Sequence, residues 1–267
     1  MSSPGAKYQA PAAACAAQVL LRLIRSQGPL TLAQLSHDLP QTKSLIYRVL
    51  TELEAESFVN RDTTGRFRLG VSAFEAGPAY LVQHHIDQMV RESLQWLSHE
   101  GNVTVNLGVL RGTEILYLHK QVSPDAYVSI SRVGGRVPAN CIAIGKVLLA
   151  QLTDDEVLQR YGPVTSLPTM TSRSISDLPG LLQELNDIRR QGYAADRGEA
   201  AIGRCGLAVA IASGAAGDDA TAISLSAEES DFDSRYAALL QLLERVKQVM
   251  ERDAKARQSM LATGAFE

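Results

Sequence analysis

Two short helical segments separated by a proline, within residues 31–56, constrain the fold of this chain more than any other feature of its sequence. Thr31 and Gln34 form a T-x-x-Q capping box, which satisfies backbone N–H groups at the start of a helix. Pro40 ends this helix, because the residue before a proline is kept out of the helical region. A second helix is predicted over about residues 42–56. The segment therefore predicts a helix-turn-helix.

The second of these helices has two different faces. Apolar residues recur at helical spacing from Leu45 to Leu53, which predicts a buried stripe. Ser44 and the polar residues three, four and seven positions later share the opposite face. A helix that enters a DNA major groove needs such a face, with hydrogen-bonding groups and cations for base edges and phosphates. The residues expected to contact DNA from this helix are Thr42, Lys43, Ser44, Tyr47, Arg48 and Thr51.

Residues 58–69 are predicted to form two short strands around an Asp-Thr-Thr-Gly turn. Arg61, Arg66 and Arg68 project from this hairpin, and we expect them to lie against phosphates or in a minor groove. Helix, turn, helix and basic hairpin together make a winged helix-turn-helix. Winged helices also mediate protein contacts, so a protein that binds other proteins remains an alternative at this point.

The charge distribution agrees with a DNA-binding segment joined to a different kind of domain. Residues 1–70 hold eight lysines and arginines against five acidic residues, a net charge of +3. The whole chain carries −3, so the remainder carries −6. A small basic segment on a larger acidic body is typical of this organisation.

Other features of the sequence exclude several classes of protein. No apolar run reaches the roughly 18 residues that a membrane-spanning helix needs, so we expect no membrane partner. The three cysteines form no CxxC motif, and we expect reduced thiols, a cytoplasmic protein, and neither a metal site nor a cofactor. Lys146 follows a glycine, but the phosphate-loop pattern GxxxxGK[ST] fails because Asn140 and Val147 occupy two of its required positions.

Beyond residue 100 the hydrophobic period changes from helical to alternating, which predicts strands. Strand pairs with interspersed helices predict an α+β domain with one antiparallel sheet flanked by helices. Strands are expected near 103–109, 115–119, 127–131, 193–197, 205–212 and 220–226, and helices over 140–151, 180–191 and 231–256. The predicted organisation is a winged helix-turn-helix over 8–70, a linker helix over 71–88 that Gly77-Pro78 interrupts, a second domain over 89–256 and a flexible tail over 257–267.

The chain resembles the IclR family of transcriptional regulators from about residue 12 to residue 250. The first domain carries the resemblance in LTLAQLSHDL and KSLIYRVLTELEAESFVNRDTTGRFRLG, and the second in GGRVPANCIAIGKVLLA, LLQELNDIRRQGYAAD, EAAIGRCGLAVAI and AISLSAEES. Two places depart from the family pattern: Leu45 replaces a commoner threonine, and Asn140-Cys141 replaces the commoner His-Ala or His-Thr. The resemblance implies a GAF-like effector domain, a homodimer or homotetramer, and operator DNA and a small organic effector as partners.

The resemblance also implies an effector pocket in the second domain. Ser224 and Ser226 are two residues apart on a strand, so both hydroxyls face the same side. N–H groups at the start of the predicted 140–151 helix favour an anion. Other roles stay open, since paired serines often face water, a cysteine often only packs, and an aspartate after a turn often caps the backbone. The positions that the resemblance assigns to the pocket are Asn140, Ala143, Ile144, Asp196, Cys205, Ser224 and Ser226.

Two functions follow from these patterns. The first is a transcriptional regulator, expected to be a repressor, whose operator affinity changes when a carboxylic acid or an aromatic catabolite binds the second domain. The second is a small-molecule-processing enzyme in which Cys205, with His119 and Asp196, acts as the nucleophile. We expect the first and not an enzyme, because no GxGxxG, HExxH or GxSxG motif occurs in the sequence.

Overall fold

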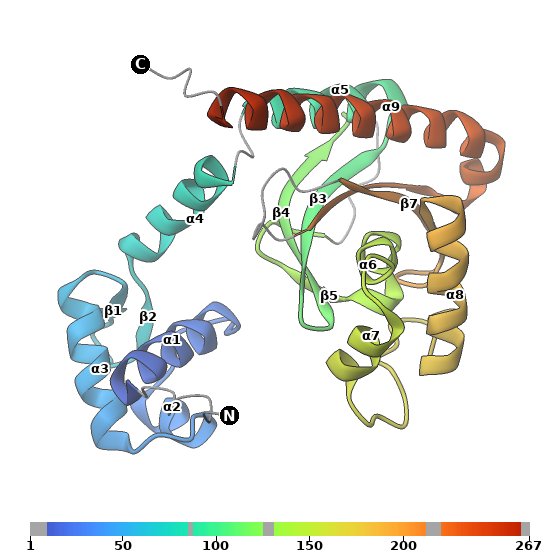
Figure 1. Ribbon diagram of the computed structural model, residues 1–267. Helices are drawn as coiled ribbons and strands as arrows, with labels where there is room; N and C mark the ends of the chain where they lie inside the picture. The colour runs from blue at the N-terminus through green and yellow to red at the C-terminus, as the bar shows by residue number, and fades with distance from the viewer. Residues whose placement is uncertain (1–9, 85–87, 125–130, 212–219, 263–267) are drawn as a thin grey trace, which may run out of the picture. The chain divides into compact units, whose positions relative to one another are not determined.

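The computed structural model describes residues 10–84, 88–124, 131–211 and 220–262, and the chain divides into two compact units after residue 85. Figure 1 shows a helical unit with a small hairpin at the N-terminal end and a sheet flanked by helices in the rest of the chain. Among the described residues, no helix is long and apolar enough to cross a membrane.

The first unit is a winged helix followed by one further helix. Its core lies between the first helix, which contributes Cys15, Val19 and Leu23, and the apolar side of the third. Phe67 of the hairpin closes this core and pairs with Leu30 through an isolated β-bridge. The elements are α1 (Pro11–Ile24), α2 (Leu32–Asp38), α3 (Lys43–Ala55), β1 (Val59–Arg61), β2 (Phe67–Leu69) and α4 (Val71–Gln83).

The start and end of α2 confirm the reasoning from sequence. The Thr31 side chain accepts a hydrogen bond from the Gln34 N–H at 3.2 Å, and Gln34 Oε1 accepts one from the Thr31 N–H at 2.8 Å. Leu39 is extended, with φ −114° and ψ 144°, as expected of a residue before a proline. The capping box and Pro40 therefore set the two ends of this helix.

Helix α4 differs from its prediction in one respect. The predicted interruption at Gly77-Pro78 was wrong, because α4 continues through Pro78. No residue of α4 is buried, so water can satisfy the carbonyl that loses its partner at the proline.

The second unit is built on a six-stranded antiparallel sheet in the order β5-β4-β3-β8-β7-β6. Helix α9 follows β8 directly and packs on one face of the sheet beside α5, and α6 packs on the other face with α8 outside it (Figure 1). The elements are α5 (Gln88–Gly101), β3 (Thr104–Arg111), β4 (Glu114–Val122), β5 (Arg136–Pro138), the 3-10 turn η1 (Ala139–Cys141), α6 (Ala143–Leu149), α7 (Asp154–Tyr161), α8 (Leu178–Gln191), β6 (Ala194–Arg197), β7 (Arg204–Ile211), β8 (Thr221–Glu228) and α9 (Glu229–Ala262).

The α+β class, with a winged helix-turn-helix, a linker helix and a sheet flanked by helices, is confirmed, and several boundaries move. The helix predicted over 140–151 is instead η1 followed by the seven-residue α6. Helix α9 extends past its predicted end at 256, through the first part of the predicted tail, to Ala262. The short strand β5 was not predicted. Most of the strand predicted over 127–131 lies outside the described residues.

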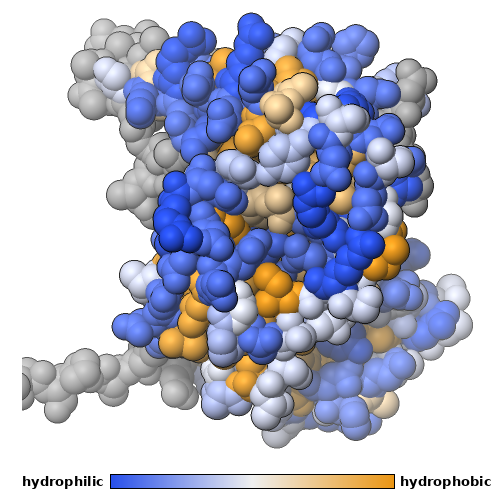
Figure 2. All heavy atoms as spheres, turned by 90° about the vertical axis from the view of Figure 1, so that its right-hand side faces the viewer, coloured by the Kyte–Doolittle hydropathy of each residue, from blue (hydrophilic) through white to orange (hydrophobic). Residues whose placement is uncertain are grey.

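The surface of the second unit on the side of α8 is mostly polar. Figure 2 shows charged and polar residues covering this face, with apolar residues in small separate groups. Apolar side chains gather instead in the core between the sheet and α6, α7 and α8. This core fixes the position of α6, which borders the candidate site described next.

Candidate functional site

The first candidate site is the polar face of α3. Lys43, Ser44, Arg48 and Thr51 are exposed, and 47% of Tyr47 is exposed, whereas Ile46, Val49 and Leu50 on the opposite side are buried. Lys43 and Arg48 have no hydrogen-bond or ion-pair partner within the described part of the chain. The helix thus presents two unpaired cations on a face that its own core leaves uncovered.

Thr42 has a structural role at the start of this helix. Its side chain accepts a hydrogen bond from the Leu45 N–H at 3.3 Å, so it is the N-cap of α3. The Thr51 hydroxyl donates to the Tyr47 carbonyl at 3.1 Å. Both residues are still exposed on the predicted side of the helix.

The three wing arginines lie in different local surroundings. Arg66 Nε donates to Asp62 Oδ2 at 3.1 Å, and Asp62 Oδ1 accepts from the Thr64 hydroxyl at 2.6 Å. These bonds, that of Thr64 foremost, hold the pKa of Asp62 well below its usual range. The Arg61 guanidinium lies 5.5 Å from the centre of the Phe67 ring. Arg68 is exposed and has no partner among the described residues, so it is the wing cation with the most freedom to meet a phosphate.

The second candidate site is a pocket of about 210 Å³ between α6 and the sheet. This volume is below the roughly 300–1,000 Å³ of pockets for drug-sized ligands, so it suits a small metabolite. Of the residues predicted for an effector pocket, it brings together Ala143, Ile144, Asp196, Ser224 and Ser226.

Strand register explains why these side chains meet. Ser224 lies opposite Asn106 of β3, and Ser226 lies opposite Gly206 of β7, which in turn lies opposite Asp196 of β6. Side chains at paired positions point to the same face of a sheet, here the face under α6. A side chain at Gly206 would approach the Leu225 carbonyl to 3.2 Å and the Ala143 methyl to 3.7 Å. Glycine at this position therefore leaves the space between Asp196 and Ser226 open.

Asp196 is both a pocket residue and a backbone cap. Its Oδ1 accepts a hydrogen bond from the Glu199 N–H at 2.7 Å, and only 7% of the residue is exposed. Burial, reinforced by the charge of Glu199, raises the pKa of this carboxyl to about 7. The pocket therefore contains a carboxyl group that takes up a proton far more readily near neutral pH than an ordinary aspartate does.

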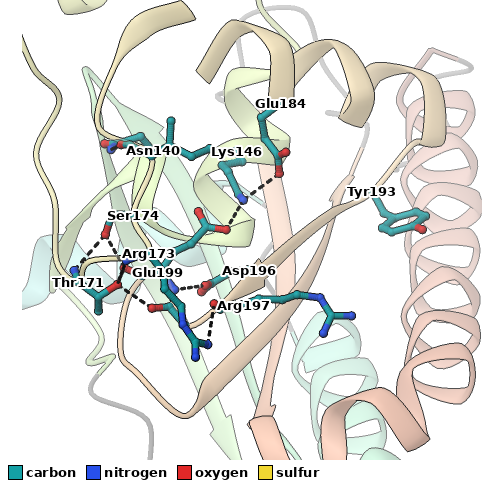
Figure 3. Close-up of polar contacts among 12 residues, drawn as sticks. Asn140, Lys146, Thr171, Arg173, Ser174, Glu184, Tyr193, Asp196, Arg197 and Glu199 are labelled. Carbon is teal, nitrogen blue, oxygen red and sulfur yellow. Dashed lines mark hydrogen bonds and ion pairs between the residues drawn. The ribbon is translucent and has the colours of Figure 1, made fainter. Parts of the chain in front are cut away.

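A buried ion cluster lies beside Asp196 and is linked to it through Glu199 (Figure 3). Lys146 of α6 is 1% exposed, and its Nζ lies 2.6 Å from Glu199 Oε1 and 2.9 Å from Glu184 Oε1. A buried lysine needs such partners, because an unpaired charge in the interior is costly. Gly145 precedes it because a Cβ there would lie 2.1 Å from the Ala139 carbonyl oxygen. This Gly-Lys pair fails as a phosphate loop, and a lysine inside the apolar run AIGKVLLA is instead a sign of a buried ion pair.

The segment 198–203 borders the pocket, and hydrogen bonds from the turn at 171–174 hold it in place (Figure 3). The Thr171 hydroxyl donates to the Gly198 carbonyl at 2.7 Å, and the Ser174 hydroxyl donates to the Glu199 carbonyl at 2.7 Å. Glu199 thus binds Lys146 with its side chain, Asp196 with its N–H and Ser174 with its carbonyl. It is the residue at which the pocket, the buried cluster and the turn meet.

Two predicted pocket residues lie elsewhere. Asn140 Nδ2 donates to the carbonyls of Pro168 and Ile175 at 2.8 and 2.9 Å, so it holds the segment before α8 and does not line the pocket. Cys205 lies opposite Arg197 and Ala227, one position out of phase with the pocket residues, and therefore faces away from α6. The pocket assignment of both residues is corrected for these reasons.

The nucleophile set of the enzyme alternative is not assembled. Burial, the largest cause, raises the pKa of the Cys205 thiol to about 11, so little thiolate forms at neutral pH. His119 lies on β4, which is separated from the β7 strand of Cys205 by β3 and β8. Strands are about 4.8 Å apart, which places these strands about 14 Å from each other. Proton transfer between the two side chains requires direct contact.

Sequence reasoning missed several pocket residues. Tyr117 of β4, Asn106 of β3, Arg204 of β7 and Ile202 line the pocket. Tyr117 and Asn106 belong to no motif, whereas Ile202 and Arg204 lie within EAAIGRCGLAVAI but were not singled out there. The alternation of apolar and polar residues in β3 and β4 showed that one face of each strand is buried. It did not show which strands lie next to β6 and β7 in the sheet. Asn106 Oδ1 accepts a hydrogen bond from the Ser131 hydroxyl at 2.8 Å, and Arg204 binds Glu228 at 2.9 Å.

Comparison with known proteins places the chain in a family. The model of the family described as "Bacterial transcriptional regulator IclR C-terminal" matches residues 78–252. The HTH-type transcriptional repressor AllR of Salmonella paratyphi A is 30% identical over 232 residues, which cover 86% of this chain and 84% of that protein. The HTH-type transcriptional regulator XynR of Escherichia coli K12 is 32% identical over 186 residues, which cover 67% of this chain and 72% of that protein.

Solved structures share the fold at lower identity. A putative IclR transcriptional regulator from Silicibacter sp. TM1040 has a TM-score of 0.82 at 19% identity, covering 91% of this chain and 96% of that one. An IclR homolog from Microbacterium hydrocarbonoxydans, solved with 4-hydroxybenzoate, has a TM-score of 0.70 at 21% identity, covering 92% and 99%. With the winged helix and the GAF-like sheet in place, these matches show that the chain belongs to the IclR family of bacterial transcriptional regulators.

Proposed function

We propose that this chain is a sequence-specific DNA-binding regulator in which α3 reads the major groove of operator DNA. The observation that carries the proposal is the exposed polar face of α3, whose cations Lys43 and Arg48 are unpaired among the described residues. Arg61 and Arg68 of the wing supply phosphate contacts that set the register on the duplex. We propose repression as its mode of action, which the name of its relative AllR supports.

A homodimer or homotetramer is part of this proposal. Helix α4 exposes the apolar side chains of Val71, Phe74 and Val82, with Phe74 75% exposed. Apolar side chains gathered on one short helix favour contact with another protein surface. Regulators with a helix-turn-helix bind two half-sites as dimers, so α4 is suited to join the DNA-binding units of two copies.

We further propose that the pocket binds a small carboxylic acid or an aromatic catabolite, and that residues 89–256 form the effector domain, joined to DNA binding through the linker 71–88. The 4-hydroxybenzoate bound to the Microbacterium relative supports this class of ligand. An effector changes operator affinity only if it binds the two arrangements of the protein with different affinity. The buried, weakly nucleophilic Cys205 favours this role over the enzyme alternative.

Binding to the DNA upstream of the gene for this protein and of its neighbours, measured by fluorescence anisotropy at several salt concentrations, tests the proposal. We expect specific binding that weakens with salt, and Arg48→Ala to weaken it by about 1–3 kcal/mol if Arg48 contacts a base. Arg190→Ala removes an exposed cation of the second unit and serves as the matched control. Equal affinity for promoter and unrelated DNA, or an unchanged affinity of the Arg48 variant, contradicts the proposed reading helix.

A further inference from the structure

The pocket is lined by two mostly buried residues whose hydroxyl groups have no partner among the described residues. Tyr117 is 6% exposed and Ser224 is 7% exposed, and both line the pocket. Neither hydroxyl has a hydrogen-bond partner within the described ranges of the chain, and neither oxygen is fully enclosed, so both are accessible from the pocket. A buried polar group without a partner is costly, so such groups in a cavity indicate a ligand or ordered water that completes them. Hydroxyls that can donate suit a ligand rich in acceptor oxygens.

The charges around Asp196 are already committed to other groups. Lys146 is shared by the carboxylates of Glu184 and Glu199, and Arg204 binds Glu228. An anionic ligand that enters while Asp196 is ionised therefore meets uncompensated negative charge in a buried space. Like charges in one buried site cannot both ionise without a large penalty. The titratable groups whose charges act near Asp196 are Tyr117, Cys141, Lys146, Glu199 and Arg204, together with Cys205 on the opposite face of the sheet.

The bond from Glu199 determines which oxygen of Asp196 holds a proton. Oδ1 accepts the Glu199 N–H at 2.7 Å, and the Ala200 N–H also binds this carboxyl, so we place the hydrogen of the protonated form on Oδ2. The Lys146–Glu199 ion pair holds the segment that supplies this N–H. Glu199 is therefore a positioning residue for the Asp196 acid.

We propose that the pocket binds the carboxylate of a small organic acid through two neutral donors, the Oδ2–H of protonated Asp196 and the hydroxyl of Tyr117, and that binding is coupled to proton uptake, because a chain whose Asp196 is ionised must gain a proton to bind the acid. The inference rests on the proposed effector-binding function and adds the donor pair and the proton linkage. The proton comes from solvent and stays on Asp196, so no bond of the ligand is broken. A tyrosine and a neutral carboxylic acid are an effective pair for stabilising an oxyanion in a buried site.

The raised pKa of Asp196 sets the size of the expected effect. With a pKa of about 7, the protonated fraction falls from about 0.9 at pH 6 to about 0.1 at pH 8. An acid that binds only the protonated form is then bound about tenfold more weakly at pH 8 than at pH 6. A neutral amide of the same shape carries no negative charge that ionised Asp196 would repel, so its affinity should show no comparable dependence on pH.

Isothermal titration of the full chain with matched probes tests this inference. The probes are lactate, pyruvate and 4-hydroxybenzoate with their amides, and 4-hydroxybenzylamine as a cation, each at pH 6 and pH 8. We expect at least one acid to bind with the tenfold dependence. We expect its apparent enthalpy at pH 8, where Asp196 is mostly ionised before binding, to vary with the ionisation enthalpy of the buffer as uptake of a proton requires. This second measurement needs no variant.

Variants separate the two donors. Asp196→Asn keeps a donor and should abolish the pH dependence of acid binding, whereas Tyr117→Phe should weaken acid binding at both pH values and keep the dependence. Asp187→Asn removes an exposed carboxyl of α8 and should change neither. Acids that bind equally at both pH values, amides or the amine binding in preference to every acid, or no probe binding at all, overturn the inference.

DNA binding by the same preparation keeps this failure distinct from failure of the proposed function. If promoter DNA is bound and a neutral or cationic probe changes that binding, the result supports the proposed regulator and contradicts the proton-linked acid site. If promoter DNA is not bound specifically while an acid binds with the tenfold dependence on pH, the result contradicts the proposed function and supports the proton-linked acid site.

Discussion

The cations of α3 and the lysine of α6 have the same charge and opposite surroundings. Lys43 and Arg48 are exposed and unpaired among the described residues, whereas Lys146 is 1% exposed and bound by two glutamates. A cation in water is available to a phosphate or a base edge, and a cation in the interior is fixed by the partners that make its burial tolerable. The difference separates residues that serve recognition from residues that hold a binding site in shape.

Removing the buried cation should have the largest effect on stability. Lys146→Met leaves Glu199 and the partly buried Glu184 without their counter-charge, and we expect a loss of about 3–5 kcal/mol. Urea denaturation followed by the fluorescence of Trp96, the single tryptophan and a residue of α5, reports on this unit. Lys43→Met is the matched control on α3, with an expected change of about 0.5 kcal/mol or less. Similar losses for both variants would remove the distinction between the two kinds of cation.

Asp196 gives the second largest effect, and its sign depends on pH. The pKa is about 7 in the folded chain and 3.8 in the reference state, so folding favours the protonated form. This contribution to stability is fully present below pH 3.8 and is lost as pH rises to about 7, by at most about 4 kcal/mol. The asparagine of Asp196→Asn does not ionise, so this variant should not lose stability as the pH rises. It should be more stable than the natural chain at pH 8, and the difference should shrink towards pH 5. A constant difference between pH 5 and pH 8 is incompatible with the buried acid.

Among the exposed cations, two arginines of the wing can be compared because only one of them has a partner. Arg68 has no partner among the described residues and Arg66 is held by Asp62. Arg68→Ala should weaken binding to all DNA sequences alike and lower the slope of log affinity against log salt by about 1. Arg66→Ala should change that slope less, because Asp62 already occupies its guanidinium. Anisotropy titrations at four salt concentrations measure both slopes. A larger change in slope for Arg66→Ala than for Arg68→Ala would contradict the proposal that Arg68 is the wing cation that is free to meet a phosphate.

The smallest effects come from two matching capping boxes, one in each unit. Thr31→Ala and Thr153→Ala each remove an N-cap, at α2 and at α7, with an expected cost of about 1 kcal/mol. Hydrogen exchange should show faster opening of α2 only in the first variant and of α7 only in the second. Opening of both helices in either variant would show that the two units do not unfold independently.

The face of α3 was readable from the sequence because a helix places residues three and four positions apart on one side. The same reasoning found the capping box at Thr31 and the turn at Asp62, whose contacts all lie within four residues. Ser224 and Ser226 were paired correctly for the equivalent reason in a strand, a period of two. In each case one short segment contains the whole signal.

The pocket could be predicted only in part from the sequence, since its walls come from six strands and one helix. Tyr117 and Asn106 were missed because nothing local shows that β3 and β4 join the sheet beside β8. Cys205 was misplaced because its side depends on register with β6 and β8, where a shift of one residue exchanges the faces. Asn140 was misplaced because its partners, the carbonyls of Pro168 and Ile175, lie far along the chain.

The sequence by itself determined the elements of the winged helix, the chemistry of its exposed face, and the family. Those features depend on contacts between near neighbours in the chain, whose geometry is set by helix and strand periods. Only the tertiary structure decided that Lys146 is paired with Glu184 and Glu199, and that Asp196, Tyr117 and Ser224 line the same space. Burial and charge neutralisation arise when distant segments pack together, so the ionisation state of the pocket is a property of the fold.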